Sequence, residues 1–122
     1  MKNLFLSFLL FFHCLLSFGQ DTISNVMTSS LPTISTPTTG ATVTLIVNRF
    51  NAINPAGTIA ALTINFPDSP QDRDIVEVKF SQIITTITYV AGTGGATILG
   101  QRNAIVGDYF RWKHDSGTNS WY

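Results

Sequence analysis

Short runs in which apolar and polar residues alternate, each closed by turn residues, fill the sequence from Ala41 to Tyr122. Alternation with a period of two residues is the repeat of a β-strand that has one buried face. Two such runs, TIAALTINF and DIVEVKF, flank the Pro- and Asp-rich turn from Pro67 to Arg73. We therefore expect a β-hairpin here, with its register set by the turn. The predicted core face of this hairpin consists of Leu62, Ile64, Phe66, Val76, Val78 and Phe80.

Roughly seven such runs follow one another, with turn residues about every ten positions and no helical period, which is typical of all-β folds. The predicted fold is all-β: a small antiparallel β-sandwich or barrel, or a trimeric β-prism-like module. The Thr-rich run over residues 83–90 suggests an outer or edge strand. Alternation places Phe110 and Trp112 on one buried face, and we expect Trp112, Trp121 and Tyr122 to close one end of the core.

One folded domain, over residues 41–122, is the most that a chain of 122 residues with this pattern can hold. The single cysteine, Cys14, lies in the N-terminal apolar run, so no disulfide within the chain can support this domain. A domain of this size without a disulfide or a metal is only marginally stable. Oligomerisation would supply the missing stability.

Residues 1–19 have the pattern of a secretion signal: Lys2, an uncharged apolar run from Leu4 to Phe18, and small residues before Gln20. We expect cleavage after Gly19. A helix of this run would be about 22 Å long, shorter than the ~30 Å hydrocarbon layer, so a retained membrane anchor is the weaker alternative.

Residues 20–40 are rich in Ser, Thr and Pro and have no sustained period. This composition predicts a linker or stalk. It cannot bury enough apolar surface to become ordered by itself, unless copies from several chains pack together.

The charge balance argues against nucleic acid as the main partner. Lys and Arg number 7, Asp and Glu also number 7, and the formal net charge is zero. With so few charges no face can be strongly basic, as a phosphate-binding surface would be.

The turn DSPQDRD offers three carboxylates, Asp68, Asp72 and Asp74, as possible Ca²⁺ ligands. The spacing of an EF-hand and its bidentate Glu are missing. Asp residues in turns usually bond to local backbone groups. We therefore predict no metal site.

Catalytic groups are equally sparse. His114 is followed by Asp115 and Ser116, but a catalytic triad requires side chains that converge, whereas neighbours around a turn splay apart. Glu77 lies in the middle of a strand beside Lys79, which is typical of a solvated pair. We predict that the protein is not an enzyme and has no catalytic residue.

Two remaining features have structural interpretations. The segment AGTGGAT, residues 91–97, lacks the Lys of a phosphate-binding loop and precedes a strand, which favours a flexible hairpin connection. The aromatic residues Tyr109, Trp112, Trp121 and Tyr122 could stack on sugars if exposed, although alternation favours the core. No cofactor is predicted.

The segments NPAGTIAALTINFP, DSPQD, VEVKFSQIITTIT and the closing TNSWY together resemble a β-module of bacteriophage virion proteins such as tail fibres, head fibres and spikes. The resemblance covers residues 42–122. It implies a homotrimeric, appendage-like structural module with no catalytic residues. The signal-like N-terminus departs from this family, because the fibres of tailed phages assemble in the cytoplasm.

Two functions follow as hypotheses. The first is a non-enzymatic virion protein, a spike, fibre or capsid decoration, whose partners are its own copies, other virion proteins or a host-surface receptor. In that case residues 1–19 could anchor it in the membrane of a lipid-containing virion. The second is a secreted or cell-surface, adhesin-like bacterial protein that binds glycans through exposed aromatic residues and begins at Gln20.

Overall fold

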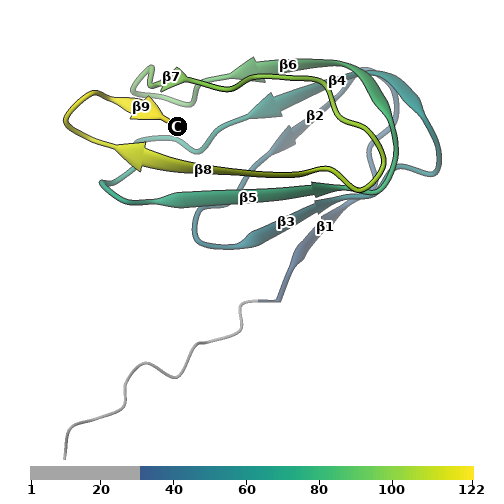
Figure 1. The fold of residues 1–122 in the computed structure, drawn as a ribbon, viewed down its shortest axis with the longest axis horizontal. Helices are drawn as coiled ribbons and strands as arrows, with labels where there is room; N and C mark the ends of the chain where they lie inside the picture. Colours follow the sequence, from purple (N-terminus) through teal and green to yellow (C-terminus); the bar gives the residue numbers. More distant parts are fainter. Residues whose placement is uncertain (1–30) are drawn as a thin grey trace, which may run out of the picture.

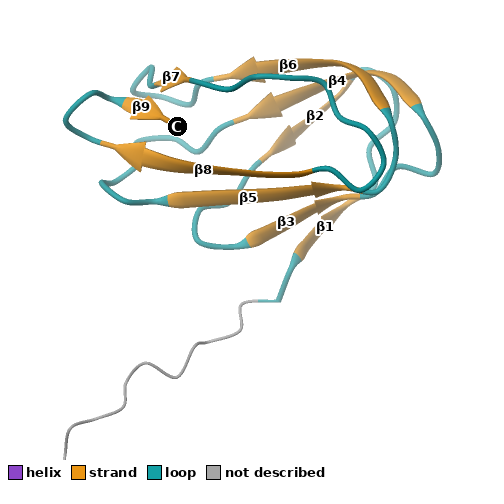
Figure 2. Ribbon diagram, viewed as in Figure 1, coloured by secondary structure: helices purple, strands orange, loops and turns teal. Residues whose placement is uncertain are grey.

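The computed structural model describes residues 31–122, which form nine β-strands and no helix (Figure 1). Strands and loops alternate throughout this part of the chain (Figure 2), and the all-β prediction is confirmed. The strands are β1 (Thr33–Ser35), β2 (Ala41–Thr44), β3 (Phe50–Ile53), β4 (Ile59–Asn65), β5 (Ile75–Phe80), β6 (Ile84–Val90), β7 (Thr97–Ile98), β8 (Tyr109–Asp115) and β9 (Ser120–Trp121). The predicted signal peptide or anchor, residues 1–19, lies outside the described residues.

The first six strands alternate between two sheets, so the chain winds as a solenoid. Strands β1, β3 and β5 lie parallel in the lower layer of Figure 1, and β2, β4 and β6 lie parallel in the upper layer. The register places Ala41 beside Leu62 and Leu62 beside Ile87. The predicted antiparallel sandwich or barrel is therefore wrong. Each coil returns to the same sheet in the same direction, so neighbouring coils pair in parallel.

The expected hairpin does not form, because β4 pairs with β2 and β6 while β5 pairs with β3 and β8. The turn from Pro67 to Arg73 carries the chain from one sheet to the other and sets no hairpin register. Alternation indicates which face of a strand is buried, but not which strand lies beside it. The six predicted core residues are confirmed, since none of them is more than 1% exposed.

The last part of the chain reverses direction and closes one end of the solenoid. The segment after β7 runs along β6, where the Ile84 N–H donates to the Ala104 C=O and the Tyr89 hydroxyl donates to the Arg102 C=O. Strand β8 pairs antiparallel with β5. The short β9 lies between β8 and β7, as Figure 1 shows.

Aromatic side chains fill the core at this closed end. The ring centroid of Phe66 lies 5.3 Å from that of Trp112 and 5.3 Å from that of Trp121. Phe110 packs against Trp112, and both are buried, as alternation predicts. Tyr122 is 55% exposed, so the expected end cluster holds for the two tryptophans but not for Tyr122.

The opposite end of the solenoid begins inside the segment predicted as a linker. Strand β1 pairs in parallel with β3, and Pro37 after it is buried, so the folded module starts before the expected boundary at Ala41. Among residues 31–122, no strand pairs with the second edge of β1 or of β2. Leu31 and Ile34 are exposed on the first coil. This end of both sheets is open within the described residues.

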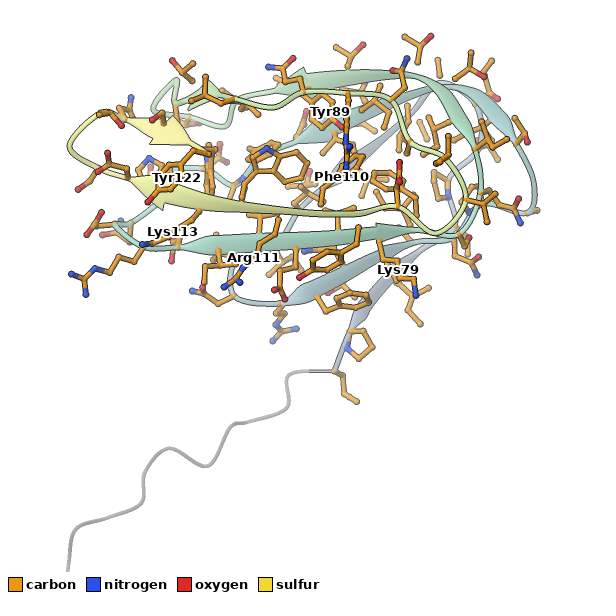
Figure 3. All side chains as sticks on the ribbon, in the orientation of Figure 1. Lys79, Tyr89, Phe110, Arg111, Lys113 and Tyr122 are labelled. Carbon is orange, nitrogen blue, oxygen red and sulfur yellow. The ribbon has the colours of Figure 1, made fainter. Side chains whose placement is uncertain are left out.

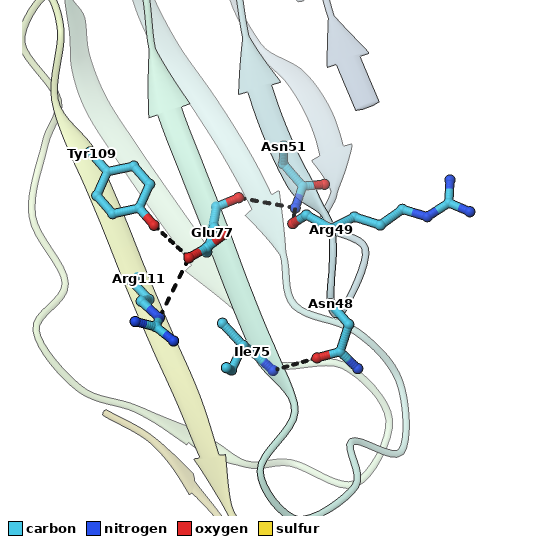
Figure 4. Close-up of polar contacts among 7 residues, drawn as sticks. All are labelled: Asn48, Arg49, Asn51, Ile75, Glu77, Tyr109 and Arg111. Atoms are coloured by element: carbon cyan, nitrogen blue, oxygen red, sulfur yellow. Dashed lines mark hydrogen bonds and ion pairs between the residues drawn. The ribbon is translucent and has the colours of Figure 1, made fainter. Parts of the chain in front are cut away.

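One buried polar side chain links neighbouring coils. Asn51 is 3% exposed, and its Oδ1 accepts a hydrogen bond from the Ile46 N–H. Its Nδ2 lies 3.1 Å from each of the carbonyl oxygens of Ile46, Arg49 and Glu77. Figure 4 shows the last two of these contacts. Asn51 therefore fastens the turn before β3 to β5.

Candidate functional site

The three carboxylates considered as Ca²⁺ ligands bond to separate backbone N–H groups. The pairs are Asp68 with Thr93, Asp72 with Ser116, and Asp74 with Gln71. The hydrogen bond from Thr93 lowers the pKa of Asp68. Within residues 31–122 no three His, Cys, Asp or Glu side chains gather as metal ligands would. The Asp residues of this turn brace the surrounding loops.

The side chains of His114, Asp115 and Ser116 do not converge. His114 points into the core, where Nδ1 lies 3.0 Å from the Gln71 carbonyl oxygen and the ring packs against Trp121. The Asp115 carboxylate accepts hydrogen bonds within its own turn, and Ser116 is exposed. The buried imidazole has a packing role in this arrangement.

Glu77 contacts Arg111 across the strands rather than Lys79, so the predicted Glu77–Lys79 pair is wrong. Its Oε1 lies 3.5 Å from Arg111 Nε and accepts a hydrogen bond of 2.6 Å from the Tyr109 hydroxyl (Figure 4). The antiparallel register puts Glu77 opposite Arg111, whereas the next outward residue on the same strand, Lys79, is opposite Tyr109. The hydrogen bond to the carboxylate raises the pKa of Tyr109. This cluster positions the Arg111 side chain on the surface of β8.

The Gly-rich segment connects β6 to β7, which lie in different sheets, so it is not the hairpin connection that the sequence predicts. The Gly95 N–H donates to the Gly92 C=O. A Cβ on Gly92 would lie 2.3 Å from the Pro67 carbonyl oxygen. The segment is a close-packed crossing, and Gly92 is required by the approach of the neighbouring backbone.

The outer surface of the β2-β4-β6 sheet has no charged side chain. Alternation with the core-packed residues of the same strands sends eight side chains outward: Thr42, Thr44, Ala61, Thr63, Asn65, Thr86, Thr88 and Val90. The register aligns Thr42, Thr63 and Thr88 in one row across the three strands. We call this surface the threonine face. The prediction of an edge strand with an exposed Thr-rich face over residues 83–90 is confirmed.

A groove of about 590 Å³ opens at the closed end of the solenoid, where β9 stops. Its lining residues are Leu99, Gly100 and Arg102 after β7, Tyr109, Phe110, Arg111 and Trp112 on β8, and Tyr122. Figure 3 shows Phe110 between the two layers, with Arg111 and Tyr122 along β8 and β9. The volume is in the range of about 300–1,000 Å³ that is usual for ligand sites. We call this site the end groove.

Hydrogen bonds fix the wall of the end groove that follows β7. The Trp112 Nε1–H donates to the Leu99 C=O at 2.8 Å, and the Tyr89 hydroxyl donates to the Arg102 C=O at 2.6 Å. The Arg102 guanidinium carbon lies 4.4 Å from the centroid of the Phe110 ring. This cation–π contact holds a positive charge above the aromatic floor of the groove.

The sequence predictions do not include Arg102 or Arg111 as functional residues. Arg111 is one polar position of an alternating strand, and Arg102 follows Gln101 in a stretch without periodicity. Of the aromatic residues considered for sugar stacking, Tyr109 and Tyr122 line the groove and are exposed, whereas Trp121 lies in the core. The site depends on contacts between distant segments, which no local pattern reveals.

No family model, curated protein or solved structure matches this chain. None of the residues from 31 to 122 is helical, so this part of the chain contains no helix that could cross a membrane. The threonine face and the end groove are the two surfaces of the described residues that suit contact with a partner or ligand.

Tyr89, which braces the end groove, gives a prediction of pH dependence. Burial is the main cause that raises the pKa of Tyr89 to about 12, whereas a tyrosine of the unfolded chain ionises near pH 10. Between these values the unfolded state loses its proton first. The stabilisation from the raised pKa is complete below about pH 10 and is lost as the pH rises through about 12. We expect the free energy of unfolding to fall in this window, measured by urea unfolding at pH 9 and pH 11.5.

The variant Tyr89→Phe separates the effect of Tyr89 ionisation on the free energy of unfolding from the effects of other groups that lose a proton at high pH. Its free energy of unfolding should fall less between the two pH values than that of the parent chain. Equal falls in the two proteins would show that Tyr89 ionises normally in the folded state.

Proposed function

We propose that this chain is a non-enzymatic structural protein of a phage virion, a spike, fibre or capsid-decoration module that assembles as a homotrimer. The threonine face carries this proposal. It presents eight outward side chains without a charge, while the other sheet bears the cluster of Glu77 and Arg111. The centres of protein interfaces are depleted in charged residues, so an uncharged sheet surface suits contact with other subunits.

The open first coil supports the same proposal. Unpaired strand edges and uncapped solenoid ends attract further pairing, and proteins usually cover them. Strand β1, whose second edge is unpaired among the described residues, begins at Thr33, shortly after residues 20–30 of the predicted stalk. In a trimer, neighbouring subunits would cover these open edges. The resemblance to modules of phage fibres and spikes agrees with this arrangement.

The localisation that accompanies this function is the virion, with residues 1–19 serving as a signal or as a membrane anchor. Other virion proteins or a host-surface receptor would then contact the solenoid. The balance of charges gives no support to nucleic acid as a partner.

The test is the absolute mass of the chain from Gln20 to Tyr122, measured by light scattering after size-exclusion chromatography at two salt concentrations. We expect a trimer at both, because an uncharged interface is little affected by screening. Thr63→Lys puts a charge in the middle row of the threonine face and should give monomers. The control Thr97→Lys, at an exposed strand position of the other sheet, should leave the trimer intact.

A monomeric parent chain would overturn the proposed assembly. A trimer that survives Thr63→Lys would show that the subunits meet at a surface other than the threonine face.

A secreted or cell-surface, adhesin-like binding protein is the second candidate. The exposure of Tyr109 and Tyr122 beside the end groove, 47% and 55%, favours it. The double variant Tyr109→Ala, Tyr122→Ala should then lose binding to cells without a change in the unfolding midpoint. Retained cell binding would count against this candidate.

A further inference from the structure

The outer surface of the sheet that contains β3, β5 and β8 carries two aromatic rings, one on each side of β5. Alternation with the buried residues of β3 and β8 sends Phe50 and Tyr109 outward. The register places Phe50 beside Glu77 and Tyr109 beside Lys79, so the two rings flank successive outward positions of β5. We call the surface formed by Phe50, Glu77, Lys79, Tyr109 and Arg111 the aromatic face.

The two rings of the aromatic face are turned the same way. Their planes differ by 17°, and their centroids lie 6.5 Å apart. Figure 4 shows the face of the Tyr109 ring beside Glu77 and Arg111. Tyr109 is 47% exposed, and Phe50 is half-buried. The pair therefore forms a small platform of two nearly parallel aromatic rings at the surface.

A polar network holds the Tyr109 ring in position. The Tyr109 hydroxyl donates a hydrogen bond of 2.6 Å to Oε1 of Glu77, and the same oxygen lies 3.5 Å from Arg111 Nε. Because the hydroxyl is already bonded to Glu77, the ring offers a ligand its apolar face. A side chain that is fixed in advance loses less conformational entropy when a ligand binds.

Positive charges exceed negative charges on the aromatic face. Lys79 is exposed and forms no ion pair among residues 31–122. Glu77 contacts the Nε of Arg111, whose side chain is 57% exposed, which leaves the rest of the guanidinium open to a ligand. Two cations thus stand against one carboxylate that already has partners. Ammonium and guanidinium groups form charge-assisted hydrogen bonds with carboxylates, so the surface favours a ligand that carries them.

Sugar chains with carboxylate groups match both kinds of contact that the aromatic face offers. The flat side of a sugar ring exposes C–H groups, which pack on the negatively polarised face of an aromatic ring. Carboxylates at the edge of the sugar would meet Lys79 and Arg111, which lie on β5 and β8 beside the two rings. A single-stranded nucleic acid also stacks on aromatic rings, but the proteins that bind it follow its backbone with a positively charged groove.

We propose that the aromatic face binds an acidic glycan, a chain of sugars that carry carboxylate groups. Its sugar rings stack on Phe50 and Tyr109. Its carboxylates pair with Lys79 and Arg111. The inference rests on the proposed function in one respect: the glycan would be the host-surface receptor of the virion protein, or the ligand of the adhesin-like candidate. The site uses no residue of the threonine face, which belongs to the other sheet.

The test uses the full chain and fluorescently labelled oligogalacturonate, with binding followed by fluorescence anisotropy. We expect saturable binding. The fully methyl-esterified oligomer keeps the sugar rings without the charge, and it should bind at least tenfold more weakly. Oligoglutamate keeps the charge without the sugar rings, and it should also bind at least tenfold more weakly.

Variants of the aromatic face separate stacking from charge. Tyr109→Ala should weaken the binding of oligogalacturonate at least tenfold, whereas Tyr109→Phe keeps the ring and should bind nearly as well as the parent chain. The double variant Lys79→Gln, Arg111→Gln should also lose at least tenfold in affinity. Arg73→Gln is the control for charge, since Arg73 is exposed on the turn before β5. Urea unfolding of each variant distinguishes lost binding from lost folding.

The proposal is overturned if oligogalacturonate does not bind, if the esterified oligomer or oligoglutamate binds as well, or if Tyr109→Ala binds as well as Tyr109→Phe. Tighter binding of single-stranded oligothymidylate would also overturn it and would assign the surface to nucleic acid. The mass measurement tests the trimer separately. A trimer that binds no acidic glycan overturns this inference alone, and a monomer that binds it supports this inference while overturning the proposed assembly.

Discussion

Replacement of Trp121 by alanine is expected to lower the free energy of unfolding by about 3–5 kcal/mol, the usual cost of removing a buried large aromatic side chain. Trp121 is 0% exposed, and its ring lies 5.3 Å from that of Phe66 and 5.1 Å from that of His114. It holds β9 against the core at the closed end. Urea unfolding followed by circular dichroism measures the loss.

The neighbouring variant Tyr122→Ala is the control for this prediction. Tyr122 is largely exposed, and its hydrogen bonds to Lys113 are made by the backbone, so we expect a change within about 0.5 kcal/mol. A Trp121→Ala protein with unchanged stability and lost ligand binding would contradict the core position of Trp121 and favour the adhesin-like candidate.

Asn51→Asp is expected to cause the second large loss in the free energy of unfolding. The carboxylate would place an oxygen where Nδ2 now faces the carbonyl oxygens of Ile46, Arg49 and Glu77. Each buried group that loses its partner costs about 1–3 kcal/mol, and a buried charge adds to this. We expect a loss of more than about 3 kcal/mol in the free energy of unfolding at pH 7, measured by urea unfolding.

Asn54→Asp provides a matched comparison, because Asn54 is exposed and its Oδ1 accepts a hydrogen bond from the Ser81 hydroxyl. A carboxylate oxygen keeps that bond, so the change should stay within about 0.5 kcal/mol. Equal losses in the two variants would mean that Asn51 does not join the coils through its amide.

The inward faces of the strands could be predicted from the sequence, because burial follows the period of two within each strand. Val76, Val78 and Phe80 are buried for this reason. The partners of the strands could not be predicted. Ile64 lies beside Tyr89 of β6, far along the chain, while the nearer strand β5 belongs to the other sheet. Apolar and polar residues alternate in the same way along a hairpin strand and along a solenoid strand, so this pattern does not distinguish the two pairings.

Strand β1 shows a second limit of local patterns. Thr33 to Ser35 are three residues in a Ser-, Thr- and Pro-rich segment whose composition predicts a linker. They form a strand because β3 offers a parallel edge at that position. Pairing within the fold thus overrides the weak local preference.

The candidate sites depend even more on contacts between distant segments. The run over residues 83–90 indicates a Thr-rich outer surface, but the row of Thr42, Thr63 and Thr88 requires the parallel register. The end groove combines three separate segments: the one after β7, strand β8 and Tyr122. Neither the threonine row nor the end groove can be predicted from any single segment of the sequence.

The parallel stacking of β2, β4 and β6 determines the rest of the architecture, because it creates the threonine face and leaves β8 to pair with β5 at the closed end of the solenoid. The most direct test is a nuclear Overhauser spectrum of the isotopically labelled chain. The predicted result is backbone contacts of Thr63 with both Thr42 and Thr88. Backbone contacts between β4 and β5, as in a hairpin across Pro67 to Arg73, would contradict it.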